Sequence, residues 1–139
     1  MQLSKNFTLA ELTVTQVSAE NEPSSLQIEA LRKLVENVLQ PLRDAYGKPI
    51  RVNSGFRSLA VNKKVGGSAT SAHCKGEAAD LSCDNNAAIF RIIREQLEFD
   101  QLIWEAGDDQ QPAWVHVSYR EGNNRNQVLR MINGKYQVI

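Results

Sequence analysis

The spacing of apolar side chains predicts one long helix between residues 24 and 47. Seven apolar residues recur every three or four positions, as on one face of an α-helix: Ile28, Leu31, Leu34, Val35, Val38, Leu42 and Ala45. Ser24 or Ser25 can cap its start and Gly47 can end it, because these residue types satisfy free backbone groups at helix ends. Pro41 lies inside the pattern and should kink or restart the helix, since proline has no amide hydrogen.

Three shorter helices are predicted on either side of the long one. Residues 7–12 are expected to form the first, with Thr8 and Glu11 as a capping box. Ser58 can cap a second that runs to Lys64. Asp84 is expected to cap a third, whose inward face carries Ile89, Ile92, Ile93 and Leu97.

Short apolar or alternating runs predict strands at residues 49–53, 77–82, 100–105 and 114–119. At the end of the chain, Asn133 and Gly134 separate two further strand-like runs, which predicts a hairpin with a type I′ turn. Helices and strands in this order indicate an α+β fold, with a small and mainly antiparallel sheet flanked by helices. The length suits one domain, residues 1–139, with one modest core.

Composition excludes several classes of protein. With 42% hydrophobic and 23% charged residues, the chain is expected to be ordered. Sixteen basic and sixteen acidic residues cancel, which argues against a nucleic-acid binder. Only a local cluster of Arg120, Arg125 and Arg130 favours one, and it is better interpreted as a solvated face. No apolar run has the length of a membrane span, and the first twelve residues lack a signal-peptide core, so we expect synthesis in the cytoplasm without Sec-type export.

The chain contains two histidines, and one of them stands seven positions before an aspartate. The residues between His73 and Asp80 include the small Gly76, Ala78 and Ala79, whereas His116 lies in a predicted buried strand. Two imidazoles and a carboxylate are the ligand set of a catalytic zinc, which keeps a further position for water. On spacing alone, however, His116 could equally be a hydrogen-bonded core residue and Asp80 could cap a turn.

The two cysteines, Cys74 and Cys83, are too few for a disulfide framework. Cys74 directly follows His73 and could compete as a soft zinc ligand. We interpret it instead as a small apolar filler, and Cys83 as part of the core or of a strand end.

Four stretches carry a resemblance to a known family: SGFRS at 54–58, VGGS at 65–68, S-x-H-x-x-G-x-A-x-D at 71–80, and WVHVS at 114–118. Together they resemble the zinc D-Ala-D-Ala carboxypeptidases. That family also includes bacteriophage L-alanyl-D-glutamate endopeptidases, and it shares its fold with the hedgehog signalling domain. The likeness runs from about Ser54 to Tyr119 and is greatest to small phage-encoded members.

The resemblance implies that His73, Asp80 and His116 bind zinc. It implies that Arg57 binds a substrate carboxylate or polarises the scissile carbonyl, for which a fork-shaped cation is suited. Ser71 matches a position that contacts substrate or supports the loop, and a purely loop-stabilising hydroxyl is an equal alternative.

The general base departs from the family pattern. Many relatives carry an acidic residue three positions before the last histidine ligand, where this chain has Ala113. Glu105, at the end of a strand expected beside that of His116, is our choice for the base. Asp108 and Asp109 in the following loop are the alternatives.

The resemblance implies a zinc-dependent peptidase that hydrolyses peptidoglycan stem peptides at a bond involving a D-amino acid, as an endolysin or a carboxypeptidase. The alternative is a catalytically silent zinc module that binds wall peptides, which Ala113 favours. A monomer without nucleic-acid or membrane partners is expected, acting on the cell wall if released or delivered in a virion. The sequence does not distinguish the two bond specificities.

Overall fold

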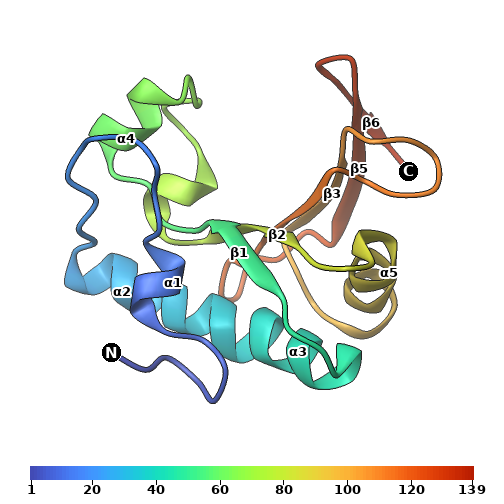
Figure 1. The fold of residues 1–139 in the computed structure, drawn as a ribbon, viewed down its shortest axis with the longest axis horizontal. Helices are drawn as coiled ribbons and strands as arrows, with labels where there is room; N and C mark the ends of the chain where they lie inside the picture. Colours follow the sequence, from blue (N-terminus) through green and yellow to red (C-terminus); the bar gives the residue numbers. More distant parts are fainter.

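The computed structural model describes residues 1–139, which form helices around one six-stranded sheet (Figure 1). The sheet order is β1-β2-β4-β3-β5-β6, and every neighbouring pair is antiparallel except β3 and β5. This arrangement confirms the predicted α+β class and its mainly antiparallel sheet. The strands are β1 (Arg51–Ser54), β2 (Ala78–Ser82), β3 (Gln101–Glu105), β4 (Trp114–Ser118), β5 (Gln127–Ile132) and β6 (Lys135–Val138).

The predicted long helix is continuous but changes its winding before Pro41. It comprises α2 (Ser25–Leu34), a π-helical segment η1 (Val35–Leu39) and α3 (Gln40–Tyr46). Pro41 lies in the first turn of α3, where its missing amide hydrogen costs little. Ser24 caps the start with a capping box, and Gly47 ends the helix with a left-handed backbone (φ 76°). The interruption predicted from proline is therefore seen as a π-helical segment within a continuous helix, not as a separate second helix.

The shorter helices are α1 (Leu9–Leu12), α4 (Leu59–Lys64), the 3₁₀ turn η2 (Ala72–Lys75) and α5 (Asn86–Gln96). Thr8 and Ser58 cap α1 and α4 as predicted. The predicted cap of α5 was wrong by one residue, because the side chain of Asn85 accepts the hydrogen bond from the Ala88 amide. Asp84 instead accepts a hydrogen bond from the hydroxyl of Tyr46.

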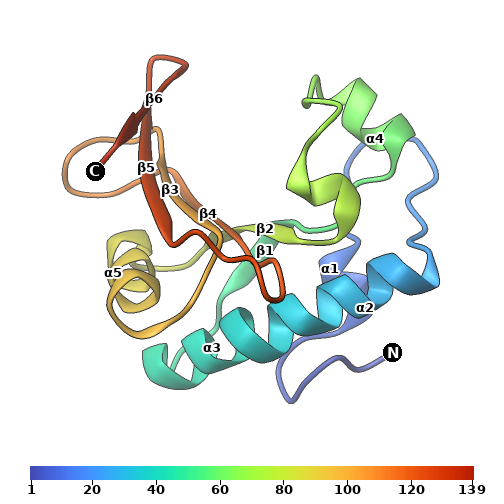
Figure 2. The ribbon, with the colours of Figure 1, turned by 180° about the vertical axis from the view of Figure 1, so that it is seen from behind.

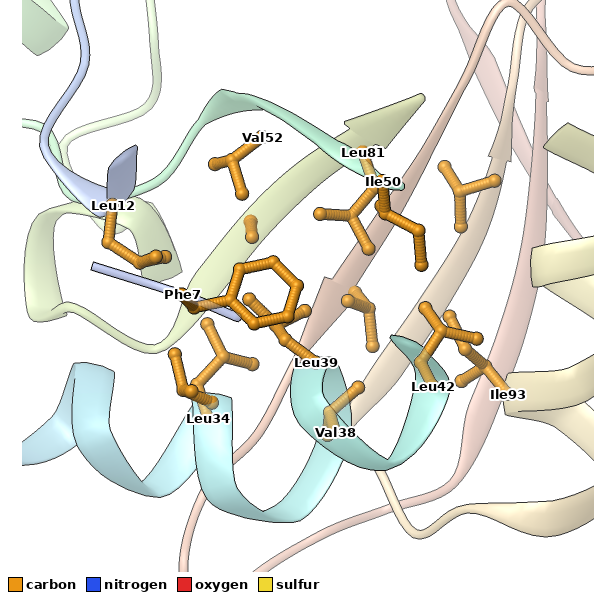
Figure 3. Close-up of a cluster of buried hydrophobic side chains, with 14 of the residues drawn as sticks. Phe7, Leu12, Leu34, Val38, Leu39, Leu42, Ile50, Val52, Leu81 and Ile93 are labelled. Carbon is orange, nitrogen blue, oxygen red and sulfur yellow. The ribbon is translucent and has the colours of Figure 1, made fainter. Parts of the chain in front are cut away.

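The core lies between the sheet and the helices α2, α3 and α5 (Figure 3). Alternate residues of the central strands, such as Leu81 on β2 and Val115 on β4, are fully buried against Leu34, Val38 and Leu42. Because successive strand residues point to opposite faces, Asp80 and His116 must project from the other face of the sheet. The apolar alternation that builds the core thus directs the polar residues away from it.

Two parts of the chain rise on that other side of the sheet (Figures 1 and 2). One contains α4 and its flanking loops, and the other is the hairpin of β5 and β6. Asn133 and Gly134 at the hairpin tip both have positive φ, 53° and 76°, as a type I′ turn requires. No helix combines the length and apolarity that crossing a membrane would demand.

Candidate metal centre

A pocket of about 600 Å³ lies over the polar face of the sheet. Its walls come from the α4 segment, from the central strands and from the C-terminal hairpin. All six residues that the sequence indicated for the site line this pocket: Arg57, Ser71, His73, Asp80, Glu105 and His116. The structure therefore brings together segments that are up to 59 positions apart in the chain, from Arg57 to His116.

Three of these side chains converge at the floor of the pocket. Asp80 on β2 lies directly opposite His116 on β4, so both side chains project from the same face. The Nδ1 atom of His116 lies 2.9 Å from Oδ1 of Asp80, and Nε2 of His73 lies 3.4 Å from the same oxygen. Candidate ligand atoms of all three residues lie within 4.8 Å of one another. Two imidazole nitrogens and a carboxylate so placed could hold one divalent metal ion.

Local structure fixes the orientation of His73. The hydroxyl of Ser71 accepts a hydrogen bond from the His73 amide at 3.2 Å, and Gly76 ends the turn with φ 74°. The His73 ring is almost fully buried, and its Nδ1 lies 2.7 Å from the carbonyl oxygen of Gly55. A carbonyl can only accept, so Nδ1 donates its hydrogen to Gly55, and Nε2 is the ring nitrogen directed towards Asp80. This is the support that metal-binding histidines usually have.

The carboxyl of Asp80 is held in its ionised form. Burial acts to raise its pKa, but hydrogen bonds from His116 and His73, together with their charges, outweigh burial. The pKa of Asp80 therefore lies well below its usual range. A metal ligand must be deprotonated, so this environment suits metal binding.

Neither cysteine belongs to the group of candidate ligands. Cys74 is half-buried but does not line the pocket, and its carbonyl accepts a hydrogen bond from Gln27. Cys83 is also half-buried and packs against the core. Both placements agree with the interpretation of these residues as fillers rather than ligands.

Arg57 lies at one end of the pocket beside His73. Its backbone amide donates to the carbonyl of His73 at 3.1 Å, and one terminal nitrogen lies 3.5 Å from the Ser71 hydroxyl. Its Nε is buried and has no hydrogen-bond partner in the chain. Because buried polar groups are nearly always paired, this donor is available to a bound ligand.

Glu105 lies on the opposite side of the three converging residues, at the end of β3. Its side chain is 6% exposed, and burial raises its pKa. The charge of His116 opposes this effect and that of Asp80 adds to it. Glu105 thus faces the same space as the candidate ligands and favours its protonated form more than an ordinary glutamate does.

The alternative acids, Asp108 and Asp109, do not line the pocket. Asp108 accepts hydrogen bonds from two amides of its own loop, those of Gln110 and Gln111, and Asp109 pairs with Arg130 at 2.6 Å. Both carboxylates therefore have structural partners elsewhere. The geometry favours Glu105 among the three acids.

Sequence reasoning missed some residues that line the pocket, above all Met131 and Tyr136 on the C-terminal hairpin. The available signal was strand alternation, because Leu129, Met131 and Tyr136 would share a face once the hairpin register was known. What could not be derived was the parallel pairing of β5 with β3, which brings the hairpin to the site.

Comparison with known proteins adds evidence that is independent of this geometry. Residues 5–118 match the model of the family described as peptidase M15. The chain belongs to the peptidase M15 family. This M15 chain is also similar to a zinc D-Ala-D-Ala carboxypeptidase from Streptomyces albus G, with 44% identity over 78 residues. The match covers 55% of this M15 chain and 31% of the relative, so the chain spans about a third of that protein.

Membership of the M15 family confirms the resemblance inferred from the sequence motifs. The matched range contains every residue of the M15 site discussed so far except Leu129, Met131 and Tyr136. The C-terminal hairpin, residues 127–138, lies beyond it.

Proposed function

We propose that this chain is a zinc-dependent peptidase that hydrolyses peptidoglycan stem peptides at a bond involving a D-amino acid. In this proposal residues 1–139 act as one zinc peptidase domain. The observation that carries the proposal is the convergence of His73, Asp80 and His116 beside a buried glutamate in one pocket. The name of the Streptomyces relative supports both the metal and the type of substrate.

Nε2 of His73, a carboxylate oxygen of Asp80 and Nδ1 of His116 would hold the metal. The chemistry of this donor set fits zinc, which accepts nitrogen and carboxylate ligands. Bound zinc supplies a Lewis acid that makes hydroxide available near neutral pH. The carbonyl of Gly55 keeps His73 in the tautomer that leaves Nε2 free.

Glu105 is proposed to move the proton. Its carboxylate would take a proton from the attacking water and deliver it to the amine that leaves. Its burial supports this role, because a raised pKa brings a carboxylate nearer to the working pH.

Arg57 is proposed to bind the carboxylate of the leaving D-residue. Its charge does not depend on pH in the working range, and its buried Nε has no partner within the chain. Ser71 lies beside it and would support both the guanidinium and the turn that carries His73. The D-Ala–D-Ala and L-Ala–D-Glu bonds of the stem peptide both release a residue with a free carboxylate, so Arg57 is compatible with either.

A digest of purified peptidoglycan tests the proposal directly. The protein would be incubated with zinc or with a chelator, and the products identified by mass spectrometry. Loss of terminal D-Ala would identify a carboxypeptidase, and release of stem peptides at the L-Ala–D-Glu bond would identify an endopeptidase. This substrate lies outside the cytoplasm, so the proposal also requires a route of release or delivery.

Substitution of Glu105 tests the assignment of the base. Glu105→Gln preserves the shape of the side chain but cannot accept the proton, so kcat should fall by about 10²–10⁴-fold. Zinc content measured by atomic emission should remain one ion per chain. Asp109→Asn is the matched control, because Asp109 lies outside the pocket and should be dispensable for turnover. Full activity of Glu105→Gln would refute the assignment.

One observation favours a second function. Ala113 stands where many relatives carry an acid, which would suit a silent module that binds wall peptides without cutting them. The same digest decides between the two. Zinc-loaded protein that binds stem peptides but releases no product would establish the silent module.

A further inference from the structure

The C-terminal hairpin forms the wall of the pocket that lies beyond Glu105. Met131 on β5 is opposite Glu105 in the parallel pairing with β3, and Tyr136 on β6 is opposite Met131. Residues that lie opposite one another in adjacent strands project from the same face of a sheet. Glu105, Met131 and Tyr136 therefore form one row across three strands, and all three line the pocket.

Tyr136 is the outermost residue of this row. Its side chain is 58% exposed, and its hydroxyl makes no hydrogen bond within the chain. Burial is the main cause that raises the pKa of Tyr136, and the negative charges of Glu105 and Asp80 raise it further. The phenol therefore lies within electrostatic reach of the site. A large aromatic ring beside the pocket is thus available to a ligand.

The row extends away from the end of the pocket that Arg57 occupies. From β4, which carries His116, to β6 there are three strand spacings, or about 14 Å at roughly 4.8 Å each. An extended peptide covers this distance with about four residues at roughly 3.3 Å per residue. The pocket therefore has the extent of a peptide groove, with a cation at one end and an aromatic ring at the other.

We propose that Met131 and Tyr136 form a subsite for the acyl part of the peptide substrate, the residues that precede the scissile bond. The direction rests on the proposed function, since Arg57 would hold the carboxylate of the leaving residue at the other end. Ring and thioether offer apolar contact to an extended backbone and its aliphatic side chains. The subsite makes this chain prefer substrates that are long on the acyl side, as a stem peptide is before its terminal D-Ala and is not before its L-Ala–D-Glu bond. It lies outside residues 5–118, the range that the family model matches.

Two synthetic substrates that share the cleaved bond test the subsite. One carries a single residue before that bond, and the other carries four. Tyr136→Ala should raise KM for the long substrate about tenfold, with kcat unchanged, and leave the short substrate unaffected. Gln137→Ala is the matched control, because Gln137 is the next residue but pairs with Arg130 on the opposite face. It should match wild type on both substrates.

Tyr136→Phe distinguishes a packing role of the ring from a chemical role of the hydroxyl. It keeps the ring and should behave as wild type, whereas a loss of kcat on both substrates would assign the hydroxyl to the reaction and overturn the subsite. Equal KM values for Tyr136→Ala and wild type on the long substrate would also overturn it.

Failure of the subsite can be distinguished from failure of the proposed function. If wild-type protein with bound zinc cuts neither substrate, the proposed function fails. Calorimetric binding of the long peptide then decides the subsite. In a Glu105→Gln background, adding Tyr136→Ala should weaken binding about tenfold, and equal affinity would refute the subsite.

Discussion

Gly55 links the packing of the fold to the geometry of the metal centre, and Gly55→Ala should damage both. The residue follows β1 at a point where the chain passes the end of α1. An added Cβ would lie 2.9 Å from the carbonyl carbon of Leu12 and 3.0 Å from its Cα, and closer still to its oxygen. All three are backbone atoms, so no side-chain rotation can relieve the contact.

The cost can be worked out from these contacts. Non-bonded carbon atoms pack without repulsion at about 3.5–4.0 Å, so the backbone at position 55 and the backbone at Leu12 must separate by about 0.5–1 Å. Overpacking of this kind costs about 1–3 kcal/mol. The separation also stretches the hydrogen bond from the Phe56 amide to the Leu12 carbonyl, now 2.7 Å, which is worth about 1 kcal/mol. We expect the free energy of unfolding to fall by about 2–4 kcal/mol, and the Tm by about 6–12 °C.

Metal binding should weaken as well, because the carbonyl of Gly55 accepts the hydrogen bond that orients His73. Loss of such support lowers metal affinity by about 10–100-fold. Thermal unfolding of the metal-free protein measures the loss of stability, and competition with a chromophoric zinc chelator measures the loss of zinc affinity.

Gly47→Ala is the control for Gly55→Ala. Gly47 ends α3 with φ 76° and open space around it, so alanine there should cost about 1 kcal/mol of stability and none of the zinc affinity. If Gly55→Ala loses stability but binds zinc as tightly as wild type, the carbonyl does not position His73. If its stability is unchanged, the steric argument itself is wrong.

Two further predictions concern stability. The buried carboxylate of Asp100 accepts two hydrogen bonds from the half-exposed guanidinium of Arg125, so Arg125→Ala should lower the free energy of unfolding at pH 7 by about 1–2 kcal/mol in urea titrations. These hydrogen bonds, together with the charge of Arg125, hold the pKa of Asp100 below its usual range although burial acts to raise it. The ion pair therefore stabilises the fold fully above the pKa that Asp100 has in the unfolded chain, and this stabilisation is lost as pH falls through the pKa of Asp100 in the folded protein. The difference in the free energy of unfolding between Arg125→Ala and wild type should shrink below about pH 4. Zinc at a thousand times its Kd should stabilise the fold by about 4 kcal/mol, and an unchanged Tm on addition of a chelator would contradict a native metal site.

Local sequence rules predicted most of the helices and the hairpin, because caps and tight turns depend on a few adjacent residues. The capping box of Thr8 and Glu11 and the turn at Asn133 and Gly134 are examples. The error at Asp84 shows where such rules stop. Asp84 and Asn85 are equally good caps by type, and the choice depends on Tyr46, which is 38 positions away and engages Asp84.

The site was predictable as a set of residues but not as an arrangement. His73 and Asp80 belong to one local motif, whereas His116 joins them only through the pairing of β2 with β4. These strands are separated in sequence by α5 and β3, and β3 then lies on the far side of β4. Nothing in the spacing of the residues indicates that order, so the convergence could be expected only from the family resemblance.

The choice among three acids shows what strand register adds to sequence. Glu105, Asp108 and Asp109 lie within five positions and cannot be ranked by spacing. In the structure, Glu105 is the last residue of β3, and the chain then turns through Ala106 and Gly107, both with positive φ. The two aspartates lie beyond this turn and outside the pocket.

The same register accounts for the departure at Ala113. The amide of Ala113 donates to the carbonyl of Glu105 at 2.9 Å, so Ala113 lies beside the end of β3, although the residue directly opposite Glu105 is Trp114. The position where many relatives carry their acid is therefore next to a residue that carries one here. Glu105 lines the pocket, whereas Ala113 does not. The pocket thus contains a carboxylate from β3 although position 113 has none, so the absence of an acid at Ala113 is not by itself an argument for a silent domain.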